Sequence, residues 1–336
     1  MTTLLMKSAD ISENLSAQAT SETTKGVYIN NSPLHFEPIT LDAIPEISRI
    51  LSMSPSLTCD YSIGGIYMWI NYFRYKYCIY RETLFITGVE ENRLDRRAFS
   101  CPVGSLPFHE SIRLIEEYCR ERDLELCFSA VPADRISQLM SYSQDFVVEE
   151  LTDWADYVYD IESFVTLSGK KYAGKRNHVN RFKIDFPQSH LDDFTIADVA
   201  EVKECLSRWT KEETIDMTSP TRVEELDQVF DVLDNMDVYK FDGALLRAGG
   251  SDDRIVAFAF GEKINNTMFV HIEKMDHGVS GAGEAIAHMF ASRMSEKYKD
   301  LQYLNREEDC GDQGLRYAKQ SWHPSMLLRK YNVVRQ

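Results

Sequence analysis

Apolar residues recur along this chain either at helical spacing or in alternation with polar residues. The two halves of the chain show these patterns in a similar order. Helical periodicity, alternation and turn residues in the first half predict a helix, a hairpin, a helix, a strand and a short helix. These elements are expected at residues 42–53, 75–89, 105–123, 124–131 and 134–142, with the hairpin turn at Arg81–Glu82.

The second half shows clearer signals. It predicts two amphipathic helices, a three-stranded meander, a glycine turn, a helix, a short strand and a last helix. Their expected positions are 195–213, 221–236, 243–248, 254–264, 267–276, 278–283, 284–297, 301–305 and 311–320. Between the two halves we expect a strand over residues 157–167.

Helices, an antiparallel meander, a glycine turn and a further helix form the core order of the GCN5-related N-acetyltransferase (GNAT) architecture, which both halves resemble. We therefore predict an α+β protein of two fused GNAT-like (acyl-CoA N-acyltransferase-like) domains, each a mixed, mainly antiparallel sheet flanked by helices. The expected parts are a disordered Ser/Thr-rich leader (1–27), an N-terminal domain (28–160) and a C-terminal domain with the active cleft (161–336).

Composition limits the classes of function. The chain has 336 residues and a net charge of −16, which argues against general affinity for nucleic acid or anionic membrane. Its seven cysteines lack metal-ligand spacing, so we predict reduced thiols and no metal site. No apolar stretch reaches the roughly 18 residues that a membrane span needs. These features predict a cytoplasmic protein without a transmembrane segment.

One stretch departs from the acidic average. GKKYAGKRNHVNRFK (169–183) holds six Lys or Arg residues and no acid. In a helix over 167–183, Lys171 and Lys175 share one face and Arg181 lies in the neighbouring row, which suits phosphate binding. The alternative is that these bases pair with residues 184–240, which hold fifteen acids and five bases.

Three further groups carry candidate chemistry. The turn with Gly278, Gly281 and Gly283 precedes a helix and could hold a pyrophosphate, although glycines are also ordinary in turns. His271 and Glu273 share one strand face and could act as a base. They could equally be an exposed edge or part of an ion pair.

The last group is the segment 304–324. Glu307, Glu308 and Asp309 end a strand, and Arg316 and Lys319 follow on one helix face. The end of a strand is a common ligand site. Capping of the following helix by Asp309 or Asp312 is the structural alternative, and it needs only one of these acids.

Three segments together resemble a known family: LSGKKYAGKRNHVNRFK, VHIEKMD and NREEDCGDQGLRYAKQSWHP. They are similar to an uncharacterised bacterial family related to the cytosolic C-terminal domain of phosphatidylglycerol lysyltransferases, over residue 35 to the end. In those relatives the donor is an aminoacyl-tRNA. The resemblance singles out Lys175, Arg176, Asn177, His271, Glu273, Lys274, Glu307, Asp309, Arg316, Lys319 and His323. In the glycine turn, Gly278 stands where acetyltransferases carry Arg or Gln, which departs from their coenzyme A loop.

These observations predict an acyl- or aminoacyl-transferase with aminoacyl-tRNA or acyl-CoA as donor substrate and no further cofactor. The acceptor would be an amine or hydroxyl on a small molecule or lipid headgroup. The donor phosphates would be bound by Lys171, Lys175, Arg176, Arg181, Gly281 and Gly283.

For the reaction itself, Glu273 or His271 is the candidate base, and Glu307 or Asp309 would orient the ammonium of an aminoacyl group. Arg316 and Lys319 could stabilise the oxyanion. The alternatives are a non-catalytic module that binds an anion or a protein partner, and a basic face with a purely structural role. The sequence does not indicate an oligomeric state.

Overall fold

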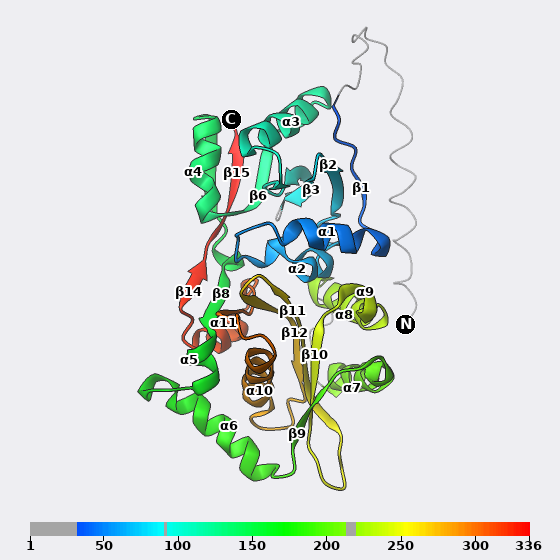
Figure 1. Cartoon of the computed structure of the whole chain (residues 1–336), viewed down its shortest axis with the longest axis vertical. Coiled ribbons are helices and arrows are strands. Elements are labelled where there is room, and N and C mark those ends of the chain that lie inside the picture. The colour runs from blue at the N-terminus through cyan, green and yellow to red at the C-terminus, as the bar shows by residue number, and fades with distance from the viewer. Residues whose placement is uncertain (1–31, 91–92, 213–219) are drawn as a thin grey trace, which may run out of the picture. The chain divides into compact units, whose positions relative to one another are not determined.

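The computed structural model describes residues 32–90, 93–212 and 220–336, so the predicted leader lies outside the described residues. The strands form two sheets (Figure 1). The first has the order β1-β2-β3-β4-β6-β15-β7, with β5 paired to β3. Its strands are β1 (Glu37–Pro38), β2 (Lys76–Tyr80), β3 (Thr83–Glu90), β4 (Arg93–Phe99), β5 (Val103–Gly104), β6 (Cys127–Pro132), β7 (Phe146–Glu150) and β15 (Lys330–Arg335).

The second sheet has the order β14-β8-β13-β12-β11-β10-β9. Its strands are β8 (Asp156–Asp160), β9 (His190–Asp193), β10 (Asp242–Arg247), β11 (Ile255–Ile264), β12 (Thr267–Met275), β13 (Tyr303–Asn305) and β14 (Met326–Leu328). In Figure 1, α10 lies on one side of β10–β12, and α7 and α8 lie on the other.

The first half contains the helices α1 (Ile44–Leu51), α2 (Ile63–Met68), α3 (Phe108–Glu121) and α4 (Ala133–Tyr142). The second contains α5 (Ile161–Thr166), α6 (Ala173–Asp185), α7 (Val199–Glu212), α8 (Pro220–Asp234), α9 (Met236–Tyr239), α10 (Ala282–Lys297) and α11 (Gln313–Gln320). No helix among the described residues has the length and apolar character needed to cross a membrane.

The two halves repeat one order of elements, as predicted, although the third meander strand of the first half, β4, was not predicted. In the first, the antiparallel strands β2, β3 and β4 are followed by α3 and by β6, which pairs with β4 in parallel. In the second, β10, β11 and β12 are followed by α10 and by β13, which is parallel to β12. The predicted α+β class, with two mainly antiparallel sheets flanked by helices, is confirmed.

The two sheets also exchange strands. β8 precedes residue 161 but pairs with β13 and β14 of the second sheet. β15 is the last strand of the chain but inserts between β6 and β7 of the first sheet. The chain therefore crosses between the halves more than once, and the boundary near residue 160 stays a prediction.

Two predicted elements were wrong in extent. The strand expected over 157–167 ends at Asp160, because the Asp160 side chain accepts a hydrogen bond from the Ser163 N–H and caps α5. The basic stretch is not one helix from residue 167. Leu167 has a left-handed conformation, residues 170–172 form a 3₁₀ turn, and α6 begins at Ala173.

The sequence also concealed several elements. We predicted no helix at α2, whose Gly64 and Gly65 disfavour helix on propensity. We predicted no strand at β4, β7, β9, β14 or β15. β4 reads RLDRRAF, in which charged residues hide the alternation of a strand.

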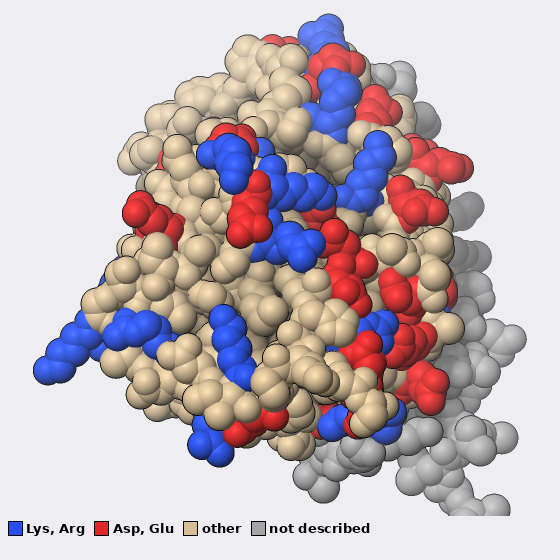
Figure 2. All heavy atoms as spheres, turned by 60° about the horizontal axis from the view of Figure 1, so that its bottom comes forward, with Lys and Arg blue, Asp and Glu red and all other residues tan. Residues whose placement is uncertain are grey.

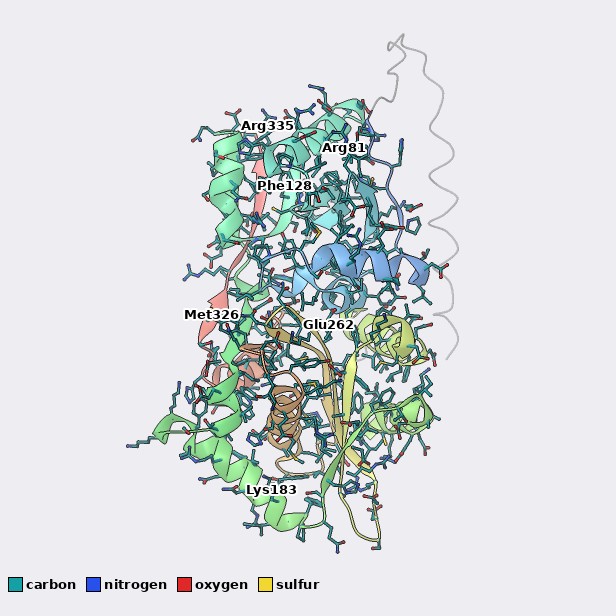
Figure 3. The ribbon with its side chains drawn as sticks, viewed as in Figure 1. Arg81, Phe128, Lys183, Glu262, Met326 and Arg335 are labelled. Carbon is teal, nitrogen blue, oxygen red and sulfur yellow. The ribbon has the colours of Figure 1, made fainter. Side chains whose placement is uncertain are left out.

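The core continues from one half to the other. A cluster of buried residues joins α1 and the first sheet with α7, α8 and one face of the second sheet, where Phe258 and Phe260 are buried. A second cluster lies on the opposite face, under α5, α6 and α10. In Figure 3, Glu262 on β11 lies where α2 meets the second sheet. This junction contains the candidate site.

Candidate functional site

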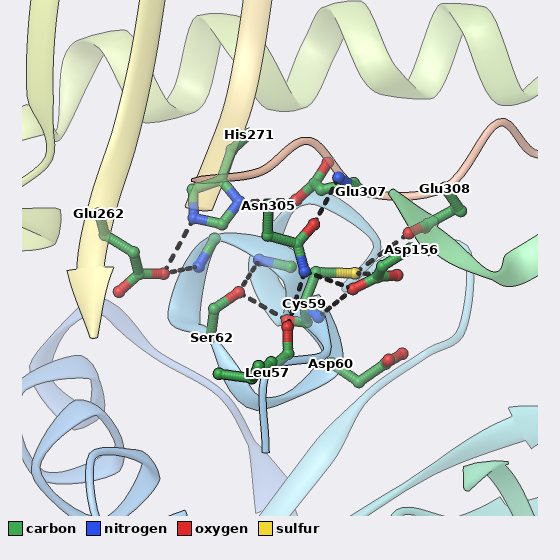
Figure 4. Close-up of polar contacts among 12 residues, drawn as sticks. Leu57, Cys59, Asp60, Ser62, Asp156, Glu262, His271, Asn305, Glu307 and Glu308 are labelled. Atoms are coloured by element: carbon green, nitrogen blue, oxygen red, sulfur yellow. Dashed lines mark hydrogen bonds and ion pairs between the residues drawn. The ribbon is translucent and has the colours of Figure 1, made fainter. Parts of the chain in front are cut away.

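The three consecutive acids after β13 each bind a different partner, because the backbone turns sharply between them. Glu307 and Cys310 have positive φ values of 58° and 49°. Glu307 contacts His271, Glu308 contacts Cys59, and Asp309 contacts Arg316. The segment therefore connects three polar groups, two of which are drawn in Figure 4.

The first group is a histidine held between two carboxylates. His271 Nδ1 is 2.7 Å from Glu307 Oε1, and Nε2 is 3.0 Å from Glu262 Oε1 (Figure 4). The imidazole is fully buried. Burial alone would lower its pKa, but the hydrogen bonds with Glu262 and Glu307 raise the pKa to about 9. His271 is thus an imidazolium at neutral pH, and its strand is central rather than an exposed edge.

The second group is built around a buried lysine at the start of β15. Lys330 Nζ lies 2.7 Å from Asp156 Oδ1, 2.8 Å from Asp60 Oδ2 and 3.5 Å from Glu308 Oε2. It is also 3.3 Å from the sulfur of Cys59. One ammonium therefore serves three carboxylates from different parts of the chain.

Backbone and amide groups fix this lysine cluster in place. The N–H of Cys59 donates to Asp156 Oδ2 at 2.6 Å. Asn305 Nδ2 donates to the same oxygen and to the carbonyl of Leu57, both at 2.7 Å. Burial raises the pKa of Asp156 above its usual value, although Lys330 opposes this. Sequence reasoning missed Cys59, Asp60, Asp156 and Lys330, because no spacing relates residues so far apart in the chain.

This cluster contains the group of side chains best placed to hold a metal ion among the described residues. Ligand atoms of Cys59, Asp156 and Glu308 lie within 4.8 Å of one another. The ammonium of Lys330, however, already lies beside both carboxylates. The ammonium of Lys330 takes the place that a metal ion would occupy. The residues as arranged therefore fit a lysine better than a metal ion.

The third group contains Asp309 and its neighbours. Asp309 accepts hydrogen bonds from Tyr157 Oη at 2.6 Å and from Arg316 Nε at 2.8 Å. Although burial opposes it, the hydrogen bond with Arg316 holds the pKa of Asp309 below its usual value. Arg316 also pairs with Asp153 at 2.7 Å. Asp312, not Asp309, caps α11 by accepting from the Leu315 N–H.

Lys319 contacts Glu308, a member of the lysine cluster. Its buried ammonium donates to the backbone carbonyl of Glu308, and burial lowers its pKa. Arg316 and Lys319 come from one helix but contact different groups. The structure therefore places each base beside one of the predicted acids, Lys319 at Glu308 and Arg316 at Asp309, and Arg316 also pairs with Asp153.

Glu273 lies in a separate ion-pair cluster with the basic stretch. Glu273 pairs with Arg306 at 2.6 Å, and Lys175 pairs with Glu284 at 3.2 Å. The ring of Trp322 lies 4.8 Å from Lys175 Nζ and 5.7 Å from the Arg306 guanidinium carbon. The alternative of an ion pair thus holds for Glu273.

The other predicted phosphate ligands point in different directions. Arg176 donates to the backbone carbonyls of Leu167 and, at 2.7 Å, Gly169. Arg181 is exposed and pairs with Asp185 at 2.8 Å. Lys171 is exposed, with its ammonium 4.8 Å from the centre of the Tyr172 ring. Among the ion pairs of the described residues, Arg181–Asp185 joins the basic stretch to the acid-rich segment 184–240.

The glycine turn (278–283) packs against α6. Gly281 has φ +80°, and a Cβ there would lie 3.1 Å from the carbonyl oxygen of His178. A Cβ at Gly283 would lie 2.9 Å from the side chain of Met275. Both glycines thus have a packing role, and α6 lies against the turn where coenzyme A pyrophosphate was predicted.

Comparison with known proteins agrees with this architecture. A protein of unknown function from Bacteroides thetaiotaomicron has a TM-score of 0.82 and 28% identity, over 90% of this chain and 100% of that chain. The C-terminal domain (DUF2156) of a putative lysylphosphatidylglycerol synthetase from Agrobacterium fabrum has a TM-score of 0.61 and 14% identity, over 88% and 92%.

A curated relative is an uncharacterised protein of Mycoplasmoides gallisepticum, 22% identical over 194 residues. The alignment covers 57% of this chain and 59% of that protein. The family described as "Phosphatidylglycerol lysyltransferase, C-terminal" matches residues 53–334. This chain belongs to the family of phosphatidylglycerol lysyltransferase C-terminal domains.

Proposed function

We propose that the protein is an aminoacyltransferase that moves an aminoacyl group from tRNA to an amine or hydroxyl acceptor. The observation that carries the proposal is the family match over residues 53–334, which includes strands of both sheets and every predicted site residue. The family is named after a lysyltransferase, so the chain is related to group-transferring enzymes.

The packing of α6 favours tRNA over acyl-CoA as the donor. In the region where the coenzyme A pyrophosphate was expected, α6 lies against Gly281. A longer polyanion would instead bind the solvent side of α6 and the turn before it. Lys170, Lys171, Arg181 and Lys183 are exposed there. In Figure 2, basic side chains stand out at the left, the side where Figure 1 has α6, and Arg181 pairs with Asp185.

The chemistry proposed for the site follows from its charges. Imidazolium His271 is a poor base, so its role would be to hold Glu307 in position. Glu307 would then orient the ammonium of the aminoacyl group. Lys319, whose pKa burial lowers, would stabilise the oxyanion or take up a proton. Glu273 would act as a base only after Arg306 moves away.

A non-catalytic binding module is the second candidate. The ion pairs Glu273–Arg306 and Asp309–Arg316 favour it, because they occupy carboxylates that a reaction would need. Such a module would bind charged tRNA and leave its ester bond intact.

The test is transfer from tRNA charged with a labelled amino acid, in the presence of amine and phosphatidylglycerol acceptors. We expect loss of label from tRNA with the intact chain, and slower loss with Glu307→Gln and Lys319→Met. Exposed Glu296→Gln is the matched control. Binding of charged tRNA without any turnover would establish the module instead. Tight binding of acetyl-coenzyme A in a calorimetric titration would contradict the choice of donor.

A further inference from the structure

His271 lies at an irregular point of β12. Two consecutive residues of β11 pair with Val270 and Ile272, so His271 between them is the extra residue of a β-bulge. The bulge changes the alternation of the strand, because Val270 and Ile272 belong to the buried clusters on opposite faces of the sheet. A bulge re-aims a side chain and is frequent beside active sites. Here the imidazole lies against α2 of the first half.

The ring of His271 is packed on its faces by apolar groups. The centre of the Phe241 ring lies 5.2 Å from the centre of the imidazole. The ring of Phe269 is nearly parallel to the imidazole at 6.4 Å. Gly64 lies directly against the ring from the first half of the chain. This packing leaves the imidazole little room to turn, so its two nitrogens keep their directions.

Glu262 links the histidine to the first half. Glu262 Oε1 lies 3.0 Å from His271 Nε2 and accepts a hydrogen bond from the Gly64 N–H at 2.7 Å. On the other side of the ring, His271 Nδ1 lies 2.7 Å from Glu307 Oε1 (Figure 4). Within the described part of the chain, these two acids form the ion pairs of the imidazole. A neutral imidazole has one N–H and could donate to one acid alone, so two carboxylates favour the charged ring.

The charge of His271 matters for Glu307. Burial raises the pKa of the Glu307 carboxyl, and its hydrogen bond with His271 opposes this. If the imidazole lost its charge, the buried carboxyl would bind a proton more readily and would lose its negative charge. The negative charge of Glu262 favours the imidazolium. Glu262 therefore acts on Glu307 through the ring between them.

We propose that Glu262 is a positioning residue, which keeps His271 charged and fixed and thereby keeps Glu307 ionised and in place. The Gly64 N–H orients Glu262, so the first half of the chain contributes to the site of the second half. The part that Glu262 plays in turnover rests on the proposed function, where Glu307 orients the aminoacyl ammonium. The effect of Glu262 on His271 does not depend on any reaction.

Glu262→Gln tests the proposal, because the amide oxygen can still accept from the Gly64 N–H while the negative charge is lost. NMR follows the titration of His271 in the full chain with ¹³C,¹⁵N-labelled histidine, and His271→Gln assigns the signal. We expect both ring nitrogens of the unchanged chain to be protonated at pH 7.5. In Glu262→Gln the pKa of His271 should fall by about 1–3 pH units, the usual effect of losing an adjacent opposite charge. Exposed Glu296→Gln, with the same change of charge, should leave the titration unchanged.

The pH profile of aminoacyl transfer from charged tRNA is the second readout. The alkaline limb of the Glu262→Gln profile should move to lower pH together with the His271 titration, which a purely structural residue would not cause. A titration that moves while the transfer profile stays fixed would overturn the role of Glu262 in turnover.

Two results would overturn the whole inference. One is a neutral His271 in the unchanged chain at pH 7.5, a measurement that requires no variant to fold. The other is an unchanged His271 titration in Glu262→Gln. A complete absence of transfer with the unchanged chain would contradict the proposed function instead, and the titration would still decide whether Glu262 holds His271.

Discussion

Gly64 on α2 lies directly against the imidazole of His271 on β12. A Cβ at position 64 would be 2.2 Å from His271 Cδ2, closer than real side chains approach. The N–H of Gly64 also donates to Glu262 Oε1 at 2.7 Å, the oxygen that lies 3.0 Å from His271 Nε2. A residue of the first half thereby completes the histidine site of the second half.

The first prediction concerns this contact. Gly64→Ala should destabilise the protein by about 1–3 kcal/mol, the usual range for overpacking, because His271 is held on both sides and cannot give way freely. Gly174→Ala is the matched control. A Cβ added at Gly174 in α6 would have nothing within 4 Å, so this substitution should stabilise the protein by about 0.5–1 kcal/mol. Urea unfolding measures both, and equal effects would contradict the proposed fit.

The second prediction is a pH dependence of stability. The folded pKa of His271, about 9, exceeds its ordinary value of 6.5. Its charge therefore stabilises the fold fully below about pH 6.5, and this contribution is lost as pH rises through 9. The difference corresponds to roughly 3 kcal/mol. His271→Gln should remove most of this dependence.

Unfolding free energies at pH 6.5 and 9.5 provide the measurement for His271, with exposed His109→Gln as the control. His109→Gln should keep the wild-type pH profile. A wild-type stability that rose between these two pH values would show that other groups dominate this range.

The third prediction concerns the lysine cluster. Lys330→Met leaves three carboxylates without their shared cation and should destabilise by about 3–5 kcal/mol. Adding Asp156→Asn should recover part of this loss, because one buried charge is removed. Lys263→Met is the control, since Lys263 pairs with exposed Asp300 and should change stability by at most about 1 kcal/mol. Additive effects in the double variant would contradict the coupling.

The fourth prediction concerns the surface of α6. Lys171→Glu and Lys183→Glu should weaken tRNA binding. They should also make the fall of log affinity with log salt shallower, by about one unit of slope for each phosphate that the variant no longer binds. Exposed Lys299→Glu, which makes the same change of net charge elsewhere, should leave the slope unchanged. A filter-binding titration at several salt concentrations measures the slopes. Equal reductions of the slope in all three variants would indicate a general charge effect.

The elements with strong local signals were predicted well. The turn at Arg81–Glu82 joins β2 and β3, and both residues have positive φ. The helices at α3 and α10 follow apolar stripes that the sequence displays. Elements whose pattern depends on a distant partner were missed. α2 contains two glycines because Cys59 and His271 approach it closely, and propensity alone disfavours a helix there.

The amino-acid sequence by itself determined the elements with strong local patterns in each half, the α+β class, and the position of the acids after β13, because local periodicity and turn chemistry specify them. Only the tertiary structure decided which groups those acids meet. Glu307, Glu308 and Asp309 are consecutive, yet they contact residues 36, 249 and 7 positions away in the chain. Such pairings depend on strand exchange and on burial, which force each charge to find a partner wherever the fold brings one near.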